Sequence, residues 1–255
     1  MKIVQPLLIL SIITTLSACA SLDDDPTADW SAAKLYQEAN DALNSKNYQT
    51  AIDYYTSLQA RYPFGRYAQQ AELEVAYAYY KSYQPDSAIA AADRFIKLHP
   101  QNKHVDYAYY LKGLVNFDRT KDYFDFIVPS DPSQNDPTPL LRAFDDFGYL
   151  VRNYPHSRYA KDARQRMIYL RNELAEYELN VADYYMRRGA WVAAANRAKY
   201  VIEHYQGCES MPQALGTMIA AYRKLGLDKL ADDVTRVLRV NFPQQAPELL
   251  AAGDE

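Results

Sequence analysis

A 37-residue step recurs along this chain of 255 residues, and it limits the possible folds more than any other feature. Five two-residue helix stops, each an aromatic residue or His followed by Pro or Gln, recur along the chain. They are Tyr62-Pro63, His99-Pro100, Tyr154-Pro155, Tyr205-Gln206 and Phe242-Pro243. Successive stops lie 37, 55, 51 and 37 residues apart. Proline ends a helix because it lacks an amide donor and clashes with the preceding turn. Self-similarity at such a period predicts stacked helical repeats rather than a globular enzyme core.

Small residues recur with the same 37-residue period at the expected helix contacts. In the second helix of each repeat they are Ala51, Ala88, Ala143, Ala194 and Ala231. In the first helix they are Ala39, Ala76, Gly113 and Ala182, with Ile219 in the last place. Such residues let paired helices cross closely. The pattern resembles the tetratricopeptide repeat (TPR), whose unit is about 34 residues. We therefore predict an all-α fold, a right-handed superhelical solenoid of five TPR-like helix pairs.

The irregular steps locate two insertions. Gly113 and Ala143 lie 30 residues apart where the other pairs have 12, so 18 residues enter repeat 3. A further 14 residues enter between repeats 3 and 4, where apolar residues at alternating spacings of three and four run from Ala163 to Tyr184 without Pro or Gly. The first insertion predicts a loop at 121–137. The second predicts one long helix, 158–188, that links repeats 3 and 4.

The N-terminus has the features of a lipoprotein signal peptide. Lys2 supplies a positive charge, an apolar stretch follows, and Leu16-Ser17-Ala18-Cys19 resembles the bacterial lipobox. That resemblance implies cleavage before Cys19 and its acylation; Ala20 and Ser21 after it resemble the signal for export to the outer membrane. The alternative is an ordinary signal peptide with an incidental cysteine. An acylated Cys19 cannot pair with Cys208, which leaves Cys208 a lone thiol between helices; the alternative is a disulfide between two molecules.

The predicted organisation has five parts. They are a signal peptide at 1–18, a lipidated tether at 19–29, repeats 1–3 at 30–156, repeats 4–5 at 157–243 and a C-terminal tail at 244–255. The apolar stretch of the signal peptide is too short and too interrupted for a good membrane-spanning helix.

Composition and motifs exclude several classes of function. A net charge of −4 gives no basic footprint for nucleic acid. Four His and two Cys are too few and too scattered for a metal cluster. The loop resembles a calcium loop only in part, because Asp136 replaces its glycine and Arg142 its bidentate acid. No motif of a hydrolase, a phosphate loop or a zinc protease occurs. We therefore expect no enzyme, no catalytic residue, no metal site and no cofactor.

Binding remains as the expected activity. Stacked helix pairs curve into a concave surface that such proteins use for recognition. The chain has 24 Tyr against 8 Phe, and Tyr combines apolar area with a hydrogen-bonding tip. We expect most of these tyrosines to lie in the repeat core and a minority to line the concave groove.

Particular strings resemble one family, the BamD family, which is outer-membrane protein assembly factor D of the BAM complex. The similarity runs from the lipobox to about Pro243. It is carried by Arg61-Tyr62-Pro63-Phe64-Gly65, Ala76-Tyr77-Ala78-Tyr79-Tyr80-Lys81, Asp93-Arg94-Phe95-Ile96, Val181-Ala182-Asp183-Tyr184-Tyr185 and Arg188-Gly189-Ala190-Trp191-Val192-Ala193. The loop after Asp118 and the tail after Pro243 match poorly.

The resemblance implies a non-enzymatic, palmitate-bearing lipoprotein scaffold on the periplasmic face of the outer membrane, where it takes part in inserting β-barrel proteins. It implies that the N-terminal repeats bind the targeting signals of unfolded β-barrel clients, through Tyr62, Phe64, Gly65, Tyr67 and Tyr77. It also implies that the C-terminal repeats contact the POTRA region of BamA, through Arg197 and Trp191, and the lipoproteins BamC and BamE. The alternative is a periplasmic TPR lipoprotein that serves as an adaptor for peptidoglycan or division enzymes.

Overall fold

The computed structural model describes residues 25–119 and 136–252, and within them all regular secondary structure is helical. The predicted signal peptide, Cys19 and most of the predicted loop lie outside the described residues. The helices are α2 (Ala32–Asn44), α3 (Tyr48–Arg61), α4 (Arg66–Lys81), α5 (Pro85–Leu98), α6 (Val105–Asp118), α7 (Thr138–Asn153), α8 (Ala160–Arg187), α9 (Trp191–His204), α10 (Met211–Lys224), α11 (Asp228–Asn241) and α12 (Ala246–Ala252).

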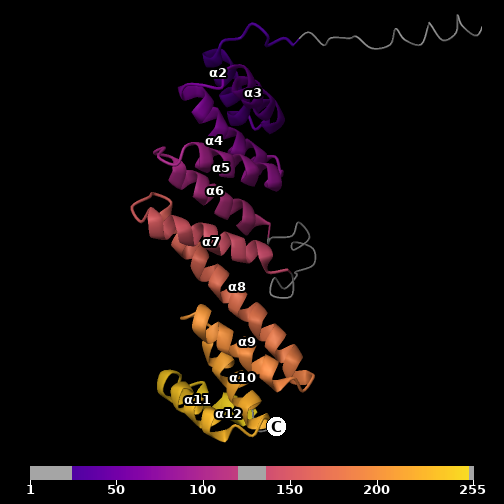
Figure 1. Ribbon diagram of the computed structural model, residues 1–255, viewed down its shortest axis with the longest axis vertical. Helices are drawn as coiled ribbons and strands as arrows, with labels where there is room; N and C mark the ends of the chain where they lie inside the picture. The colour runs from indigo at the N-terminus through magenta and orange to yellow at the C-terminus, as the bar shows by residue number, and fades with distance from the viewer. Residues whose placement is uncertain (1–24, 120–135, 253–255) are drawn as a thin grey trace, which may run out of the picture.

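The helices stack in chain order along one axis, from α2 and α3 at one end to α11 and α12 at the other (Figure 1). From α2 to α11, each helix packs on its neighbours in the sequence, as expected for helix pairs that bury their apolar faces against the next pair. The prediction of an all-α TPR-like solenoid is therefore confirmed. Short helix α12 adds to the five predicted pairs, and it packs on α10, where Leu249 lies against Gly216.

The small residues of the 37-residue pattern mark the helix crossings. Ala39, Ala51, Ala76 and Ala88 are all fully buried. Gly113 makes the closest approach, because a Cβ atom added there would lie 2.5 Å from the ring of buried Phe147. This is why a glycine replaces alanine at this step of the pattern.

The turns inside the repeats share a left-handed residue. Lys46 and Tyr83 have φ of 62° and 59°, and Gly189 and Gly226 have φ of 72° and 70°. The two residues of each pair are 37 positions apart, so the same turn conformation recurs in four repeats. Glycine adopts this conformation without steric cost, whereas Lys46 and Tyr83 bear a cost that the packing of the repeat must offset.

Helix α8 joins the two halves of the molecule (Figure 1). It spans 28 residues, Ala160–Arg187, where the sequence predicts 158–188, and at 1.5 Å per residue it is about 42 Å long. Its inner face holds the largest described core cluster, with Ala163, Leu170 and Leu174 buried between α7 and α9. Tyr184, placed by the pattern on the same stripe, is 47% exposed.

Candidate functional site

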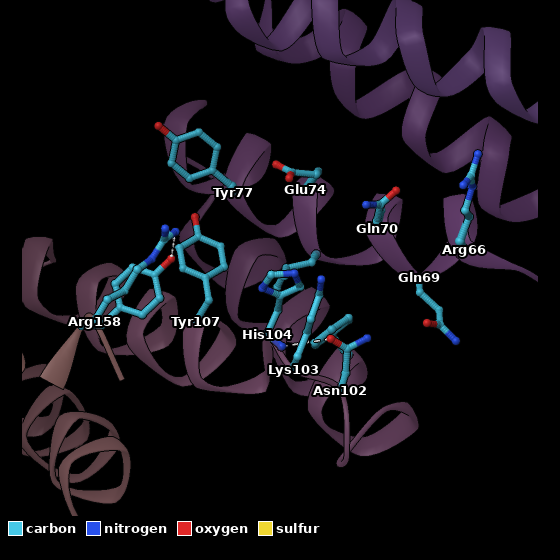
Figure 2. A pocket seen from close by; sticks show the side chains of 13 residues that line it. Arg66, Gln69, Gln70, Glu74, Tyr77, Asn102, Lys103, His104, Tyr107 and Arg158 are labelled. Carbon is cyan, nitrogen blue, oxygen red and sulfur yellow. Dashed lines mark hydrogen bonds between the residues drawn. The ribbon is translucent and has the colours of Figure 1, made fainter. Parts of the chain in front are cut away.

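A groove of about 640 Å³ runs along the N-terminal half of the solenoid. One wall is α4, and the other is formed by the α5–α6 turn, the start of α6 and the residues that enter α8 (Figure 2). First helices of three successive repeats therefore build it, as expected for the inner surface of a TPR-like solenoid. It is lined by Arg66, Gln69, Gln70, Leu73, Glu74, Tyr77, Phe95, Asn102, Lys103, His104, Tyr107, Arg158 and Tyr159.

Three of the groove's cations occupy one position of the repeat. Arg66, Lys103 and Arg158 each stand three residues after a helix-stop proline. Arg66 and Arg158 each fold over the tyrosine that follows, with the guanidinium carbon 4.9 Å and 4.7 Å from the ring centroid. The repeat thus places exposed positive charge along the groove. The sequence alone did not lead us to these three cations, although their constant distance from the helix-stop prolines could have identified them.

Aromatic side chains form much of the groove surface. The rings of Tyr107 and Tyr159 lie 5.3 Å apart, centroid to centroid. Burial raises the pKa of Tyr107, so its phenol stays protonated and remains a hydrogen-bond donor at neutral pH. Tyr77 comes from the opposite helix, α4. The groove therefore offers flat apolar surfaces with polar tips.

Glu74 is the acidic residue of the groove lining. It is half-buried on α4, and burial raises the pKa of its carboxyl group. No residue of the described ranges donates a hydrogen bond to it or forms an ion pair with it. Burial also raises the pKa of Asp146, but that carboxylate contacts Lys112 at 3.0 Å and Asn116 at 3.2 Å. A half-buried carboxylate without such partners destabilises the fold.

Glu74→Gln is therefore expected to raise stability in a pH-dependent way. Because the folded-state pKa of Glu74 is raised, its ionised form opposes folding, and this penalty grows as pH rises through that pKa. We expect the unfolding midpoint of the variant to exceed that of the parent by roughly 2–4 °C at pH 7, with the difference lost at about pH 4. Thermal unfolding followed by circular dichroism measures both values. Glu176→Gln, on the exposed face of α8, is the matched control, and a destabilised Glu74→Gln variant at pH 7 would contradict this account.

The five residues predicted to bind clients lie in different surroundings. Tyr77 lines the groove, whereas Phe64 and Gly65 form the α3–α4 corner, where Phe64 is 91% exposed and Gly65 has φ of 103°. Tyr62 is partly exposed there. The Tyr67 ring packs against the Tyr36 ring, 5.3 Å away, in the core of repeat 1. The structure therefore brings together a corner and a groove, adjacent at Arg66, rather than one five-residue site.

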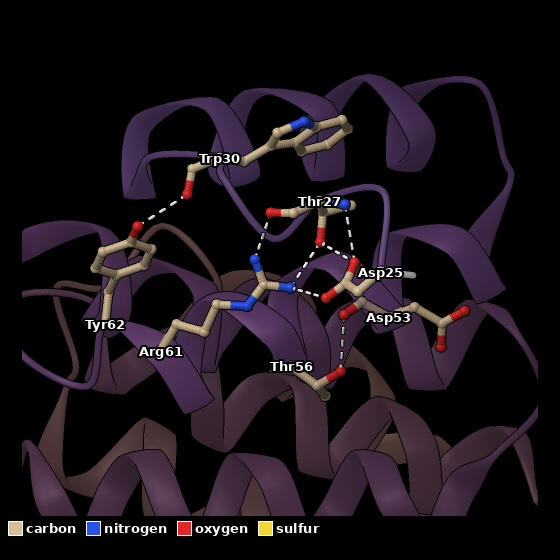
Figure 3. A network of polar contacts seen from close by, with 7 residues as sticks. All are labelled: Asp25, Thr27, Trp30, Asp53, Thr56, Arg61 and Tyr62. Atoms are coloured by element: carbon tan, nitrogen blue, oxygen red, sulfur yellow. Dashed lines mark hydrogen bonds and ion pairs between the residues drawn. The ribbon is translucent and has the colours of Figure 1, made fainter. Parts of the chain in front are cut away.

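A polar network fastens the N-terminal segment to this corner (Figure 3). Arg61 donates hydrogen bonds to the Asp25 carboxylate, with which it forms an ion pair, and to the carbonyl oxygen and hydroxyl of Thr27. The Tyr62 hydroxyl donates to the carbonyl oxygen of Trp30 at 2.8 Å. The sequence analysis did not predict these contacts, which join residues more than 30 positions apart.

In the C-terminal half, the two residues predicted to bind BamA have structural contacts. Arg197 on α9 donates a hydrogen bond to Glu178 on α8 at 2.8 Å, and this bond raises the pKa of Arg197. Glu178 is buried, whereas the Arg197 side chain is 43% exposed. Trp191 begins α9 and packs with Tyr185 and Tyr222 around small buried residues. Arg197 therefore pairs with a buried acid while part of its own side chain remains exposed.

The predicted membrane anchor and the second cysteine lie in different parts of the chain. Cys19, the predicted acylation site, lies outside the described residues. Among the helices of the described ranges, none combines the length and apolar character needed to span a bilayer. Cys208 is a buried free thiol in the α9–α10 connection, and burial raises its pKa.

Comparison with known proteins gives consistent matches. A family model described as outer membrane lipoprotein, YfiO, matches residues 28–237. Outer membrane protein assembly factor BamD of Neisseria meningitidis serogroup B (strain MC58) is 46% identical over 243 residues, covering 93% of this chain and 91% of the relative. BamD of Xylella fastidiosa (strain 9a5c) is 40% identical, covering 82% and 72%. BamD of Vibrio cholerae serotype O1 is 36% identical, covering 91% and 96%. The crystal structure of MamA protein aligns with 18% identity and a TM-score of 0.31, over 85% of this chain and 94% of that chain.

Proposed function

The chain belongs to the BamD family of outer membrane protein assembly factors, and from this premise we propose that it is a non-enzymatic lipoprotein scaffold of the BAM complex. It binds BamA and the targeting signals of unfolded β-barrel clients while it is anchored to the outer membrane and faces the periplasm. The groove along α4, α6 and the start of α8 is the observation that carries the client-binding part.

The groove suits an extended peptide. Its length crosses three repeats, and its surface alternates tyrosine rings, amide side chains and exposed cations. Tyr77 belongs to it directly, and the corner with Tyr62, Phe64 and Gly65 adjoins it through Arg66, whose guanidinium lies over the ring of Tyr67. An unfolded segment can therefore bind in the groove while an aromatic side chain packs on Phe64, which is unusually exposed for a phenylalanine.

Partner binding belongs to the opposite half of the solenoid. Arg197 and Trp191 on α9 contact the POTRA region of BamA, and the C-terminal repeats also contact BamC and BamE where these are present. Helix α8 supports this division, because its start adjoins the groove and its Glu178 holds Arg197. From its start to Glu178, α8 is about 27 Å long at 1.5 Å per residue, and this rigid separation allows a client and BamA to be bound at the same time without overlap.

The anchor is the covalently acylated Cys19. Replacing Cys19 with alanine is expected to lower the membrane-bound fraction at least about tenfold in cells without the partner proteins, because the acyl chains supply the membrane affinity. Fractionation of envelopes after a carbonate wash, with immunoblotting, measures this. Cys208→Ala removes the other cysteine and should leave the fraction unchanged. A Cys19→Ala chain that stays membrane-bound without its partners would show that the lipobox interpretation is wrong.

The scaffold role is tested by purifying the acylated protein from the envelope and identifying what co-purifies. BamA and unfolded β-barrel precursors are the expected partners. Recovery of peptidoglycan or division enzymes in their place would overturn the proposal.

A further inference from the structure

Several acids that the fold buries between helices have a partner, whereas Glu74 in the groove wall has none within the described ranges. Within the described ranges, Glu72 on α4 contacts His99 at the end of α5 at 2.8 Å. Glu178 on α8 contacts Arg197 on α9, also at 2.8 Å. Asp146 has Lys112 and Asn116. Glu74, half-buried in the groove wall, has no such partner in this part of the chain. A group that costs stability and has no internal partner is a candidate for function.

The cations of the groove do not offset Glu74. Burial is the resolved cause of its raised pKa, and no attraction to Arg66, Lys103 or Arg158 lowers it. Figure 2 shows Glu74 on the α4 wall between Gln70 and Tyr77, with Tyr107 and His104 on the opposite wall. Its carboxylate points along the α4 wall toward Tyr77 and forms part of the groove lining, where a bound molecule can reach it.

We propose that Glu74, together with Tyr77 and Tyr107, forms a subsite for one basic side chain, lysine or arginine, of the segment that binds in the groove. The inference rests on the proposed client-binding function and adds a sequence preference to it. A basic group would form a charge-assisted hydrogen bond with the carboxylate. The two tyrosine rings favour a cation as well, since the face of an aromatic ring attracts positive charge.

Other side chains fit this position poorly. An acidic side chain would place a second negative charge beside a half-buried carboxylate. An apolar side chain would exclude water from Glu74 and leave the carboxylate without a donor, at a cost comparable to an unmade hydrogen bond. A main-chain N–H could satisfy Glu74, but every peptide offers one, and it would create no preference for a basic residue.

The helix geometry fixes the spacing of the ligand. Arg66 and Glu74 are eight residues apart on α4, which is an axial distance of about 12 Å at 1.5 Å per residue. An extended segment advances about 3.3 Å per residue. A carboxylate bound at Arg66, either an acidic side chain or the chain terminus, would therefore lie about four residues from the basic side chain at Glu74.

The test measures the binding of labelled peptides to the full-length acylated protein in detergent by fluorescence anisotropy. The probe is a ten-residue peptide from the C-terminal strand of an outer-membrane β-barrel of the same organism, with a lysine placed at each position in turn. The best-binding peptide is compared with its Lys→Gln and Lys→Glu forms. The peptides are also made with an amidated C-terminus, which removes the terminal carboxylate. Weaker binding of the amidated forms would identify the chain terminus, and unchanged binding an acidic side chain, as the group bound at Arg66.

For the parent protein, Lys→Gln should weaken binding about tenfold, and Lys→Glu should weaken it further. In the Glu74→Gln variant the preference for lysine should disappear, so that the Lys and Gln peptides bind with about equal affinity. The Glu176→Gln control should keep the tenfold preference. Circular dichroism checks that each variant is folded.

An undiminished lysine preference in Glu74→Gln would overturn the subsite, as would equal binding of the Lys and Gln peptides by the parent protein. In both cases the groove would still bind peptide, and the client-binding function would stand. Failure of every peptide to bind the parent protein would overturn both proposals together.

Discussion

Arg197→Glu is expected to lower the unfolding midpoint by roughly 5–10 °C and to abolish capture of the BamA POTRA region. The substitution removes the partner of buried Glu178 and places a second carboxylate beside it. Removing one partner of a buried pair leaves the other charge unpaired. Because Arg197 is partly exposed, the cost here is about 2–3 kcal/mol. Thermal unfolding and a pull-down with the purified POTRA region measure the two effects.

A charge swap separates the structural effect from the interface effect. The double variant Glu178→Arg with Arg197→Glu restores an ion pair of reversed orientation, so it should recover much of the lost stability. If Arg197 contacts BamA, the swap should still fail to capture the POTRA region. Recovery of stability and capture together would remove Arg197 from the interface and leave it a purely structural residue.

Arg187→Glu is the matched control for this experiment. Arg187 also pairs with an acid, Asp183, but both side chains are more than 60% exposed and lie one turn apart on α8. Exposed pairs of this kind contribute little to stability. The control should therefore shift the midpoint by no more than about 2 °C and should not affect capture.

The repeat architecture could be predicted because its causes are visible in the sequence. Helices that cross closely need Ala or Gly at the contact, and prolines end the second helices, so both leave a periodic record. Gly189 and Gly226 likewise show where the backbone turns through positive φ. The same turn at Lys46 and Tyr83 leaves no such sign, because those residue types do not indicate a left-handed conformation.

The contacts of the candidate sites could not be predicted, because they join residues that are far apart in the sequence. Nothing in the local sequence pairs Arg197 with Glu178, or Arg61 with Asp25, and periodicity does not show that Glu74 lacks a partner. The similarity to the BamD family pointed to Tyr77 and Arg197 but not to Glu74. The three groove cations could be predicted in part. Each lies three residues after a helix-stop proline, but this spacing gains a meaning only when the groove is known.

The central claim is that this chain serves the assembly of outer-membrane β-barrels, and depletion in its own host tests it most directly. The chromosomal copy is placed under a repressible promoter, and a plasmid carries either the parent chain or no chain. Folded β-barrels are quantified by their heat-modifiable mobility on gels, alongside microscopy of septation.

We expect folded barrels to decline several-fold as the protein is diluted by growth, before any septation defect, and the plasmid-borne chain to restore them. Normal levels of folded barrels in depleted cells that fail to divide would contradict the account and favour a role with peptidoglycan or division enzymes.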